Sequence, residues 1–341
     1  MILFLFLSTI LFSPENSYYP TINAAELAIA DGNYELAMQQ YDAAFAVQPI
    51  PLAQDLYNAS LCAIQLNNPE KSMSLCLQLA DKGVPVSFFS KKSSYASIRK
   101  NTHWTAFVQE AEERQAAFKE RNKDNLALLN GLLTRSDKVY KDYQMNPRSE
   151  YALNEYRWAG DSLCKIVLGY LQQTGYLSEE QFGVAILRDT VLNARPVFAR
   201  IMDRRPLLVN VHLDTLFRRL FYQQGVNSGK LKPEQAAELT YGRMDLREGY
   251  AAHYFVLYGK NLYHSTSIAT TQAATIRQHL GLPRLEDELV KIRSAIPAQP
   301  NGFLFSIFLK QQRSVNELAI HEQQFLQAHT LTINNIAPDG P

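Results

Sequence analysis

The stretch DGNYELAMQQYDAAFAVQP, residues 31–49, decides how the first part of this chain folds. Its glycine, Gly32, suits the left-handed backbone conformation in which many helices end. After it, small and aromatic residues recur at helical spacing, at Ala37, Tyr41 and Ala44. The alanines let a second helix approach the first closely, and the tyrosine fills the gap between them. The stretch therefore predicts the turn and the second helix of a helical hairpin.

A second copy of this pattern follows at a constant offset of 35 residues. Residues 24–49 read AAELAIADGNYELAMQQYDAAFAVQP, and residues 59–84 read ASLCAIQLNNPEKSMSLCLQLADKGV. In the second copy Asn68 and Pro69 replace the glycine turn, as an N-cap followed by proline at the first helical position. Because at least three such units are usually needed for a stable array, the apolar residues of 88–118 predict a third hairpin.

The first copy resembles a tetratricopeptide repeat (TPR), a helix-turn-helix unit of about 34 residues. The matching residues are Gly32, Tyr34, Ala37, Tyr41, Ala44 and Pro49. The resemblance implies that these residues serve packing, and that binding falls to a concave face built from the first helix of each hairpin. The candidate partner-binding residues on or near that face are Glu26, Ile29, Gln54, Tyr57, Leu61 and Gln65.

Length and composition bound the rest of the chain. With 341 residues, 46% of them hydrophobic, two domains are expected. The apolar residues recur mostly at steps of three and four, which predicts an all-α fold and argues against a sheet-rich one. Residues 109–125 are charged and poor in aromatics, as in an exposed helix, and we place the domain change there, near residue 120. A hairpin array over residues 18–120 would then be packed against a helical domain over residues 121–341.

Helix boundaries in the second half are well marked. Asn146 with Pro147, Pro233, and Leu282 with Pro283 each open a predicted helix, and Ser178 with Gln181 forms a capping box before FGVAIL. The fold of residues 295–341 is left open. The run FLFSIFL, residues 303–309, fits a buried helical turn or a short strand equally well.

The chain begins with an apolar run, MILFLFLSTILF, at residues 1–12. The run is too short to span a bilayer but has the length of the hydrophobic part of a signal peptide. We predict a signal peptide over residues 1–17, an extracytoplasmic (periplasmic or secreted) location and no transmembrane span. No basic residue precedes the run and no small-x-small pattern follows, so a buried N-terminal segment is the alternative. The cysteines, Cys62, Cys76 and Cys164, lack disulfide-framework spacing and are predicted to be buried thiols.

A second resemblance covers roughly residues 125–293. It is carried by the run from Leu163 to Gly175, then SEEQFG, LKPEQAAELTYGRMDLREGYAAHYFVLYG and IRQHLGLPRLEDEL, which resemble an all-helical bacterial domain of unknown function. Members carry Asp-Arg before a Gln-x-Tyr-Gly-Thr-Gln element. Arg243, Tyr258 and Gly259 match residue by residue, whereas Gly242 replaces the aspartate and Lys260-Asn261 replace Thr-Gln. The resemblance therefore implies no activity.

The same region contains the candidate catalytic residues Arg243, His253 and Tyr258. A histidine titrates near neutrality and suits general acid or base work. No nucleophile or carboxylate accompanies His253, so these three residues specify no reaction. The alternative without a catalytic role is a tyrosine-rich helix followed by a loop. Zinc-ligand spacing, phosphate-binding loops and a serine elbow are all missing from the sequence, which predicts neither a metal nor a cofactor.

The net charge of +1 provides no field that would gather nucleic acid or anionic lipid. Arginines concentrate only between Arg188 and Arg219, where they fit a solvated helix face better than a groove for an anionic ligand. The preferred hypothesis is a non-enzymatic interaction or scaffold protein that binds another protein or a peptide. The alternative is an enzyme, such as a hydrolase, with a site near Arg243, His253 and Tyr258.

Overall fold

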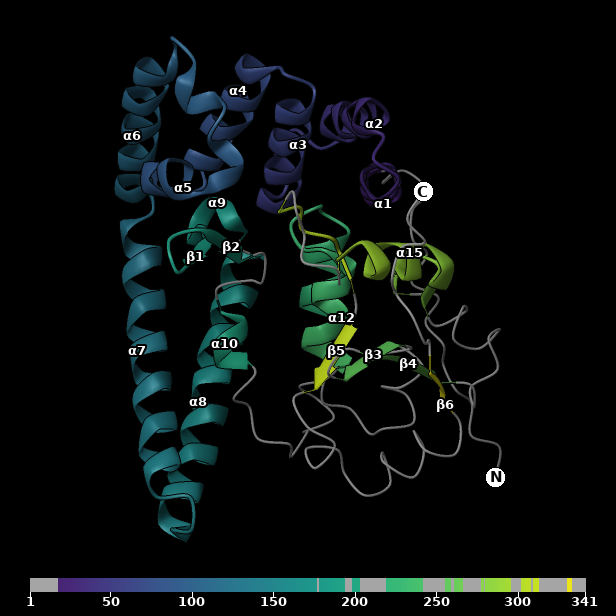
Figure 1. Ribbon diagram of the computed structural model, residues 1–341. Coiled ribbons are helices and arrows are strands. Elements are labelled where there is room, and N and C mark those ends of the chain that lie inside the picture. Colours follow the sequence, from purple (N-terminus) through teal and green to yellow (C-terminus); the bar gives the residue numbers. More distant parts are fainter. Residues whose placement is uncertain are drawn as a thin grey trace.

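Most of the described chain is helical, which confirms the all-α prediction (Figure 1). Helical hairpins lie at one end of the molecule, two long antiparallel helices run along one side, and short elements fill the rest (Figure 1). The computed structural model describes residues 18–176, 178–193, 198–202, 219–241, 255–258, 261–265, 277–278, 280–295, 302–307, 309–312 and 330–332.

Two helical hairpins open the described chain. They are formed by α1 (Tyr18–Ala30), α2 (Tyr34–Val47), α3 (Ala53–Gln65) and α4 (Pro69–Ala80). The starts of α2 and α4 are 35 residues apart, which is also the offset of the sequence repeat. Gly32 has a φ of 73°, as its turn position requires. Asn68 accepts a hydrogen bond from the main-chain N–H of Lys71 at 3.0 Å, so it caps α4 as predicted.

Only the second half of the third predicted hairpin is a continuous helix. Its second helix is α6 (Trp104–Arg121), but its first half is split into α5 (Val86–Lys91), η1 (Ser93–Tyr95) and η2 (Ile98–Lys100). Serines at 93 and 94 favour local turns over a continuing helix. The aromatic residues still pack inward, since Phe88, Phe89 and Tyr95 are fully buried.

The two long helices α7 (Lys123–Met145) and α8 (Glu150–Thr174) pack antiparallel (Figure 1). The domain change predicted near residue 120 falls close to the break between α6 and α7 at Asn122. Helix α8 begins three residues after the predicted Pro147, because the Ser149 hydroxyl caps it by accepting from the main-chain N–H of Ala152.

The remaining elements are short. They are α9 (Glu179–Phe182), β1 (Ala185–Leu187), β2 (Val191–Asn193), α10 (Ala199–Met202), the π-helical turn η3 (Arg219–Val226), α12 (Pro233–Tyr241) and α15 (Leu285–Ala295). The capping box of Ser178 and Gln181 is present, and Pro233 opens α12 as predicted. Helix α9 nevertheless ends at Gly183, and part of FGVAIL becomes β1, which pairs antiparallel with β2.

Four short strands form a small sheet within the mostly helical structure. In the order β5-β3-β4-β6 they are β5 (Leu309–Gln312), β3 (Phe255–Tyr258), β4 (Asn261–Ser265) and β6 (Thr330–Thr332). The interpretation of the region around His253 and Tyr258 as a helix and loop is therefore wrong at residues 255–258 and 261–265, which are strands that pair antiparallel. Aromatic and β-branched residues there favour strands. Residues 302–307 form neither helix nor strand, whereas the predicted alternatives were one or the other.

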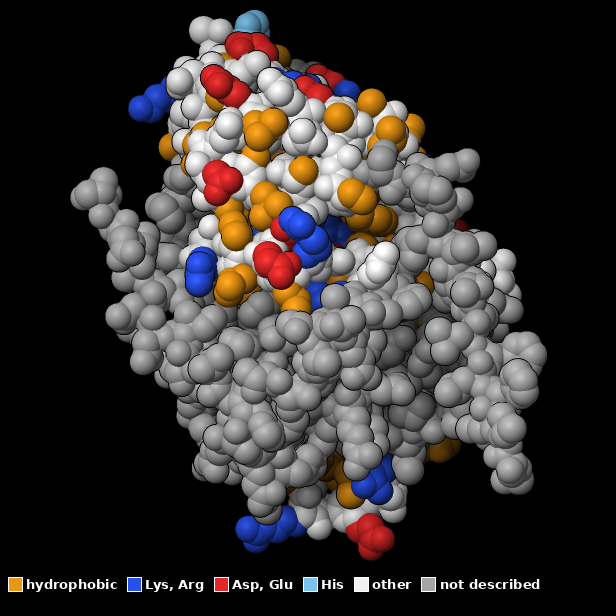
Figure 2. Space-filling view, turned by 90° about the vertical axis from the view of Figure 1, so that its right-hand side faces the viewer, with side chains coloured by type: hydrophobic (Ala, Val, Ile, Leu, Met, Phe, Trp, Pro, Cys, Tyr) orange, Lys and Arg blue, Asp and Glu red, His pale blue; other side chains and the backbone are white. Residues whose placement is uncertain are grey.

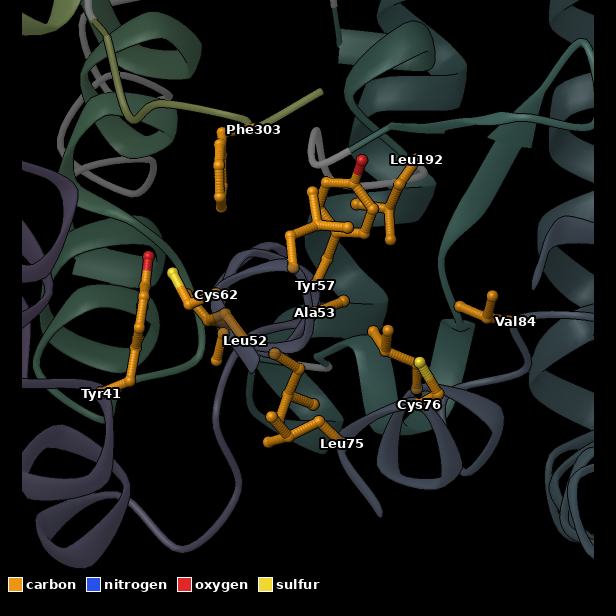
Figure 3. Packing of buried hydrophobic residues seen from close by; sticks show 14 of the residues in the cluster. Tyr41, Leu52, Ala53, Tyr57, Cys62, Leu75, Cys76, Val84, Leu192 and Phe303 are labelled. Carbon is orange, nitrogen blue, oxygen red and sulfur yellow. The ribbon is translucent and has the colours of Figure 1, made fainter. Parts of the chain in front are cut away.

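The hydrophobic core of the hairpins includes residues from later parts of the chain. Phe303 and Leu192 point into the cluster that contains Tyr41, Leu52 and Tyr57 (Figure 3). A second cluster lies between α7, α8, η3 and α12. The cysteines are free and buried, as predicted, and burial raises the pKa of the Cys62 and Cys76 thiols to about 12.

The signal-peptide prediction concerns residues 1–17, which lie outside the described residues. Among the helices that the structure does describe, none has the length and apolar character needed to cross a membrane. On the face shown in Figure 2, acidic and basic side chains lie next to each other among apolar ones. This mixture fits the near-zero net charge of the chain.

Candidate functional site

The candidate partner-binding residues lie mainly in α1 and α3, and five of the six are buried. Glu26, Gln54 and Tyr57 come together on one face, where all three contact residues 302–307 of the same chain. Ile29 and Leu61 belong to the hydrophobic core, and Gln65 is exposed at the end of α3. Three of the six candidate residues, Glu26, Gln54 and Tyr57, therefore share a surface of α1 and α3, and a segment of the chain itself covers it.

Side chains of α3 hold the main chain of this segment. Asn58 donates from Nδ2 to the carbonyl oxygen of Leu304 at 2.5 Å and accepts from the Leu304 N–H at 2.9 Å. Gln54 Nε2 donates to the same carbonyl at 2.9 Å, and the Tyr57 hydroxyl donates to the carbonyl of Gly302 at 2.7 Å. These contacts at Leu304 and Gly302 involve only main-chain atoms of the segment, so they leave its side chains free to make the further contacts of the face.

The contacts alternate along the segment. Gly302, Leu304 and Ser306 each bond to the face through main-chain atoms, the last through its N–H to Glu26 Oε2 at 3.0 Å. A spacing of two residues between equivalent contacts is that of an extended chain. The face of α1 and α3 is thus shaped to hold an extended polypeptide.

Apolar side chains anchor the segment between these contacts. Phe303 is 4% exposed and stacks on Tyr34, with the ring centroids 5.8 Å apart and the planes at 18°. Leu304 and Phe305 pack partly buried against the same cluster. Burying one phenylalanine contributes roughly 1.5–3 kcal/mol, so Phe303 supplies a large share of the binding energy of the segment.

A buried ion cluster closes one end of the face. Lys232 Nζ lies 2.6 Å from Asp55 Oδ1, 2.6 Å from Ser306 Oγ and 3.5 Å from Glu26 Oε1. Lys291 Nζ lies 3.0 Å from Glu26 Oε2. Ser306 Oγ donates to Glu26 Oε1 at 2.6 Å. Helices α1, α3 and α15, the residue that precedes α12, and the segment thus share one charged network.

The charges of this network shift its pKa values. Burial alone would raise the pKa of Glu26, but Lys291, Lys232 and the Ser306 hydroxyl outweigh it and the pKa is lowered. Burial likewise opposes the charge of Lys232, yet the carboxylates of Asp55 and Glu26 raise its pKa. Both groups are therefore charged at neutral pH.

Asn58→Ala tests the clamp on the segment. The variant leaves the Leu304 N–H without its acceptor, while Gln54 still bonds the carbonyl, so we expect a loss of about 2 kcal/mol in the free energy of unfolding. Chymotrypsin should also cleave faster after Phe303 and Phe305. Asn130→Ala, at an exposed position in α7, is the matched control and should change neither result. Unchanged cleavage in Asn58→Ala would mean that Asn58 does not hold the segment.

Several residues of this site were not among the residues predicted from the sequence. Asn58 could have been found, because it lies one helical turn after Gln54 and shares its face. Asp55 was passed over although it is adjacent to Gln54. The sequence around Lys232 and Lys291 does not indicate that they form ion pairs, because the carboxylates that they bind lie far away in the sequence.

Arg243 and His253 lie outside the described residues, and of Tyr258 only the backbone in β3 is described. In the arginine-rich region, Arg188 is exposed at a φ of 50°, and most of the other arginines up to Arg219 lie outside the described residues. Within the described chain, no three His, Cys, Asp or Glu side chains are grouped so that they could hold a metal ion.

Together, the fold and this face define an all-α protein with a helical-hairpin array whose inner face holds an extended segment of its own chain. Comparisons with protein-family models, curated proteins and solved structures found no match to this chain.

Proposed function

We propose that this is a non-enzymatic interaction protein whose TPR-like hairpin array binds an extended polypeptide segment of a partner. The observation that carries the proposal is the pair of hydrogen bonds between Asn58 and the main chain of Leu304. An amide side chain that bonds to both the N–H and the carbonyl of one residue recognises the main chain of a polypeptide. In the free protein, residues 302–307 occupy the face, and a partner segment replaces them.

The contacts of residues 302–307 also indicate what a partner segment should contain. An aromatic residue is needed where Phe303 stacks on Tyr34. A hydroxyl is needed three positions later, where Ser306 Oγ accepts from Lys232 and donates to Glu26. The tethered segment competes with any partner, which lowers the apparent affinity of the partner by the fraction of time for which the face is open.

A peptide with the sequence of residues 302–307, GFLFSI, tests this proposal on the full-length chain. We expect weak binding to the unmodified protein and at least tenfold tighter binding to Phe303→Ala, in which the tethered segment has lost its aromatic anchor. Fluorescence anisotropy of the labelled peptide measures both affinities. The double variant Phe303→Ala with Asn58→Ala should lose the gain.

A scrambled peptide of the same composition is the control. If Phe303→Ala is folded and binds neither peptide, or both equally, the face holds its own segment for structural reasons only and the proposal fails. The apolar run at residues 1–12 supports an extracytoplasmic place for the interaction, as in an exported protein.

A further inference from the structure

A cavity of about 210 Å³ lies beside the ion cluster and is lined by Glu26, Lys232 and Ser306 of that cluster but by no residue of α3. Its walls come from α1, the start of α12, the loop before α15 with α15 itself, and Ser306. Its volume is below the roughly 300–1,000 Å³ of sites for drug-sized ligands, so it suits a small molecule or a single side chain.

Two hydrogen-bond acceptors that line this cavity receive no donor from another described residue. The Glu234 side chain is more than nine-tenths buried, and among the described residues only its own main-chain N–H bonds to the carboxylate. Asn23 Oδ1 is buried without a hydrogen-bond partner. The orientation of that amide is fixed, because Asn23 Nδ2 donates to Asp287 Oδ2 at 3.0 Å. A buried acceptor without a donor, such as Asn23 Oδ1, costs free energy, and the Glu234 carboxylate can accept further hydrogen bonds, so both groups favour a ligand that donates.

The charges around the cavity point to the sign of that ligand. Three buried carboxylates, Glu26, Asp55 and Glu234, interact here with two buried ammonium groups, Lys232 and Lys291. Both lysines are bonded to Glu26 or Asp55, and neither forms an ion pair with Glu234 in the described structure. Asp287 and Arg284, which also line the cavity, pair with each other at 2.9 Å. Among the described residues around the cavity one negative charge is therefore left without a paired cation, and it is that of Glu234.

We propose that this cavity binds a primary ammonium group, whose N–H donors bond to the Glu234 carboxylate and to Asn23 Oδ1. Such a group has three donors and one positive charge, which match the two free acceptors and the leftover carboxylate. Ile22, Pro233 and Leu282 supply apolar walls for a short alkyl chain attached to it. This inference goes beyond polypeptide binding by Gln54, Tyr57 and Asn58, and it concerns the protein with residues 302–307 in place, because Ser306 forms part of the cavity wall.

Burial also raises the pKa of Glu234, although Lys291 and Lys232 oppose the shift. An ammonium ligand favours the ionised carboxylate, so binding should weaken as the pH falls and Glu234 takes up a proton. A ligand held only by the apolar walls would show no such dependence.

The test is calorimetric titration of the full-length protein with n-butylammonium chloride near neutral pH. We expect saturable binding of one equivalent, none for butan-1-ol, and affinity at least tenfold weaker in Glu234→Gln. Glu70→Gln is the matched control, because Glu70 also follows a proline at the start of a helix but is exposed. It should bind butylammonium like the unmodified protein.

The same titration with Nα-acetyl-lysine amide separates two sources of the group. Equal affinity for both probes assigns the cavity to a lysine side chain of a partner, and binding of butylammonium alone assigns it to a free amine. Binding of butan-1-ol as tight as that of butylammonium, or no binding of either amine by the unmodified protein, overturns the proposal. If Glu234→Gln fails to fold, the comparison of butylammonium with butan-1-ol on the unmodified protein still tests whether the ammonium group is required for binding.

Discussion

Lys232→Met should lower the free energy of unfolding by about 3–5 kcal/mol, as expected when one partner of a buried ion pair is removed. Lys232 is 2% exposed, and its ammonium bonds to Asp55, Ser306 and Glu26. Methionine fills much of the same volume, so the loss arises from the two carboxylates and not from a cavity. A typical domain is stable by only about 5–15 kcal/mol, so this one change removes a large share of the total.

Urea titration followed by circular dichroism measures the effect. Lys71→Met is the control, since Lys71 pairs at 2.8 Å with Asp42 near the surface, where the two side chains are 39% and 54% exposed, and such pairs contribute at most about 1 kcal/mol. Adding Asp55→Asn to Lys232→Met should restore part of the stability, because the uncompensated carboxylate is then gone. A loss below about 1 kcal/mol in Lys232→Met would contradict the buried pair.

The second large effect is expected at alkaline pH, where the protein should unfold cooperatively about one pH unit above pH 10. Within the described part of the chain, burial is the largest cause that raises the pKa of the following almost fully buried tyrosines: Tyr18, Tyr41, Tyr57, Tyr95 and Tyr176. The unfolded chain loses these protons near pH 10, while the folded chain keeps them.

The sign follows from proton binding. A group whose pKa is raised by folding stabilises the protein in full below its unfolded pKa, and that contribution is lost as the pH rises towards its folded pKa. Each buried tyrosine then costs about 1.4 kcal/mol per pH unit above about pH 10, so five cost on the order of 7 kcal/mol per unit. Lys232 acts in the same direction, since its pKa is raised too.

Tyrosinate absorbance and far-ultraviolet circular dichroism, recorded on one sample, check this expectation. Most of the tyrosinate signal should appear together with the loss of helix, and returning to neutral pH should reverse both changes. If all tyrosines ionise near pH 10 while the helical signal persists, the aromatic cluster around Tyr57 and Tyr95 is open to solvent, contrary to the structure.

Local signals in the sequence were good predictors of local structure. The turn at Gly32, the cap at Asn68, the capping box of Ser178 and the start of α12 at Pro233 each depend on hydrogen bonds within a few residues. Where the local signal was ambiguous, the predictions failed. The run at residues 303–309 fitted helix or strand, and its first part is neither, because Asn58 and Gln54 satisfy its main chain.

The candidate site shows the same division. Helical spacing was enough to put Glu26, Gln54 and Tyr57 on one face. It could not show that the face is covered, because Asn58 and Leu304 are 246 residues apart and the sequence around one does not indicate contact with the other. TPR membership and the extracytoplasmic location stay predictions, as does binding of a partner, which the peptide titration addresses.

By itself, the sequence determined that this protein is built of helices, that two of its hairpins repeat at 35 residues, and which residues pack between them. These properties follow from the spacing of apolar and turn residues, which acts over one or two helical turns. Only the tertiary structure decided that residues 302–307 cover the inner face and that Lys232 and Lys291 neutralise Glu26 and Asp55. A charge or main-chain group that is buried needs a partner, and here the partner comes from a segment far away in the sequence. Local sequence patterns cannot predict such a pairing.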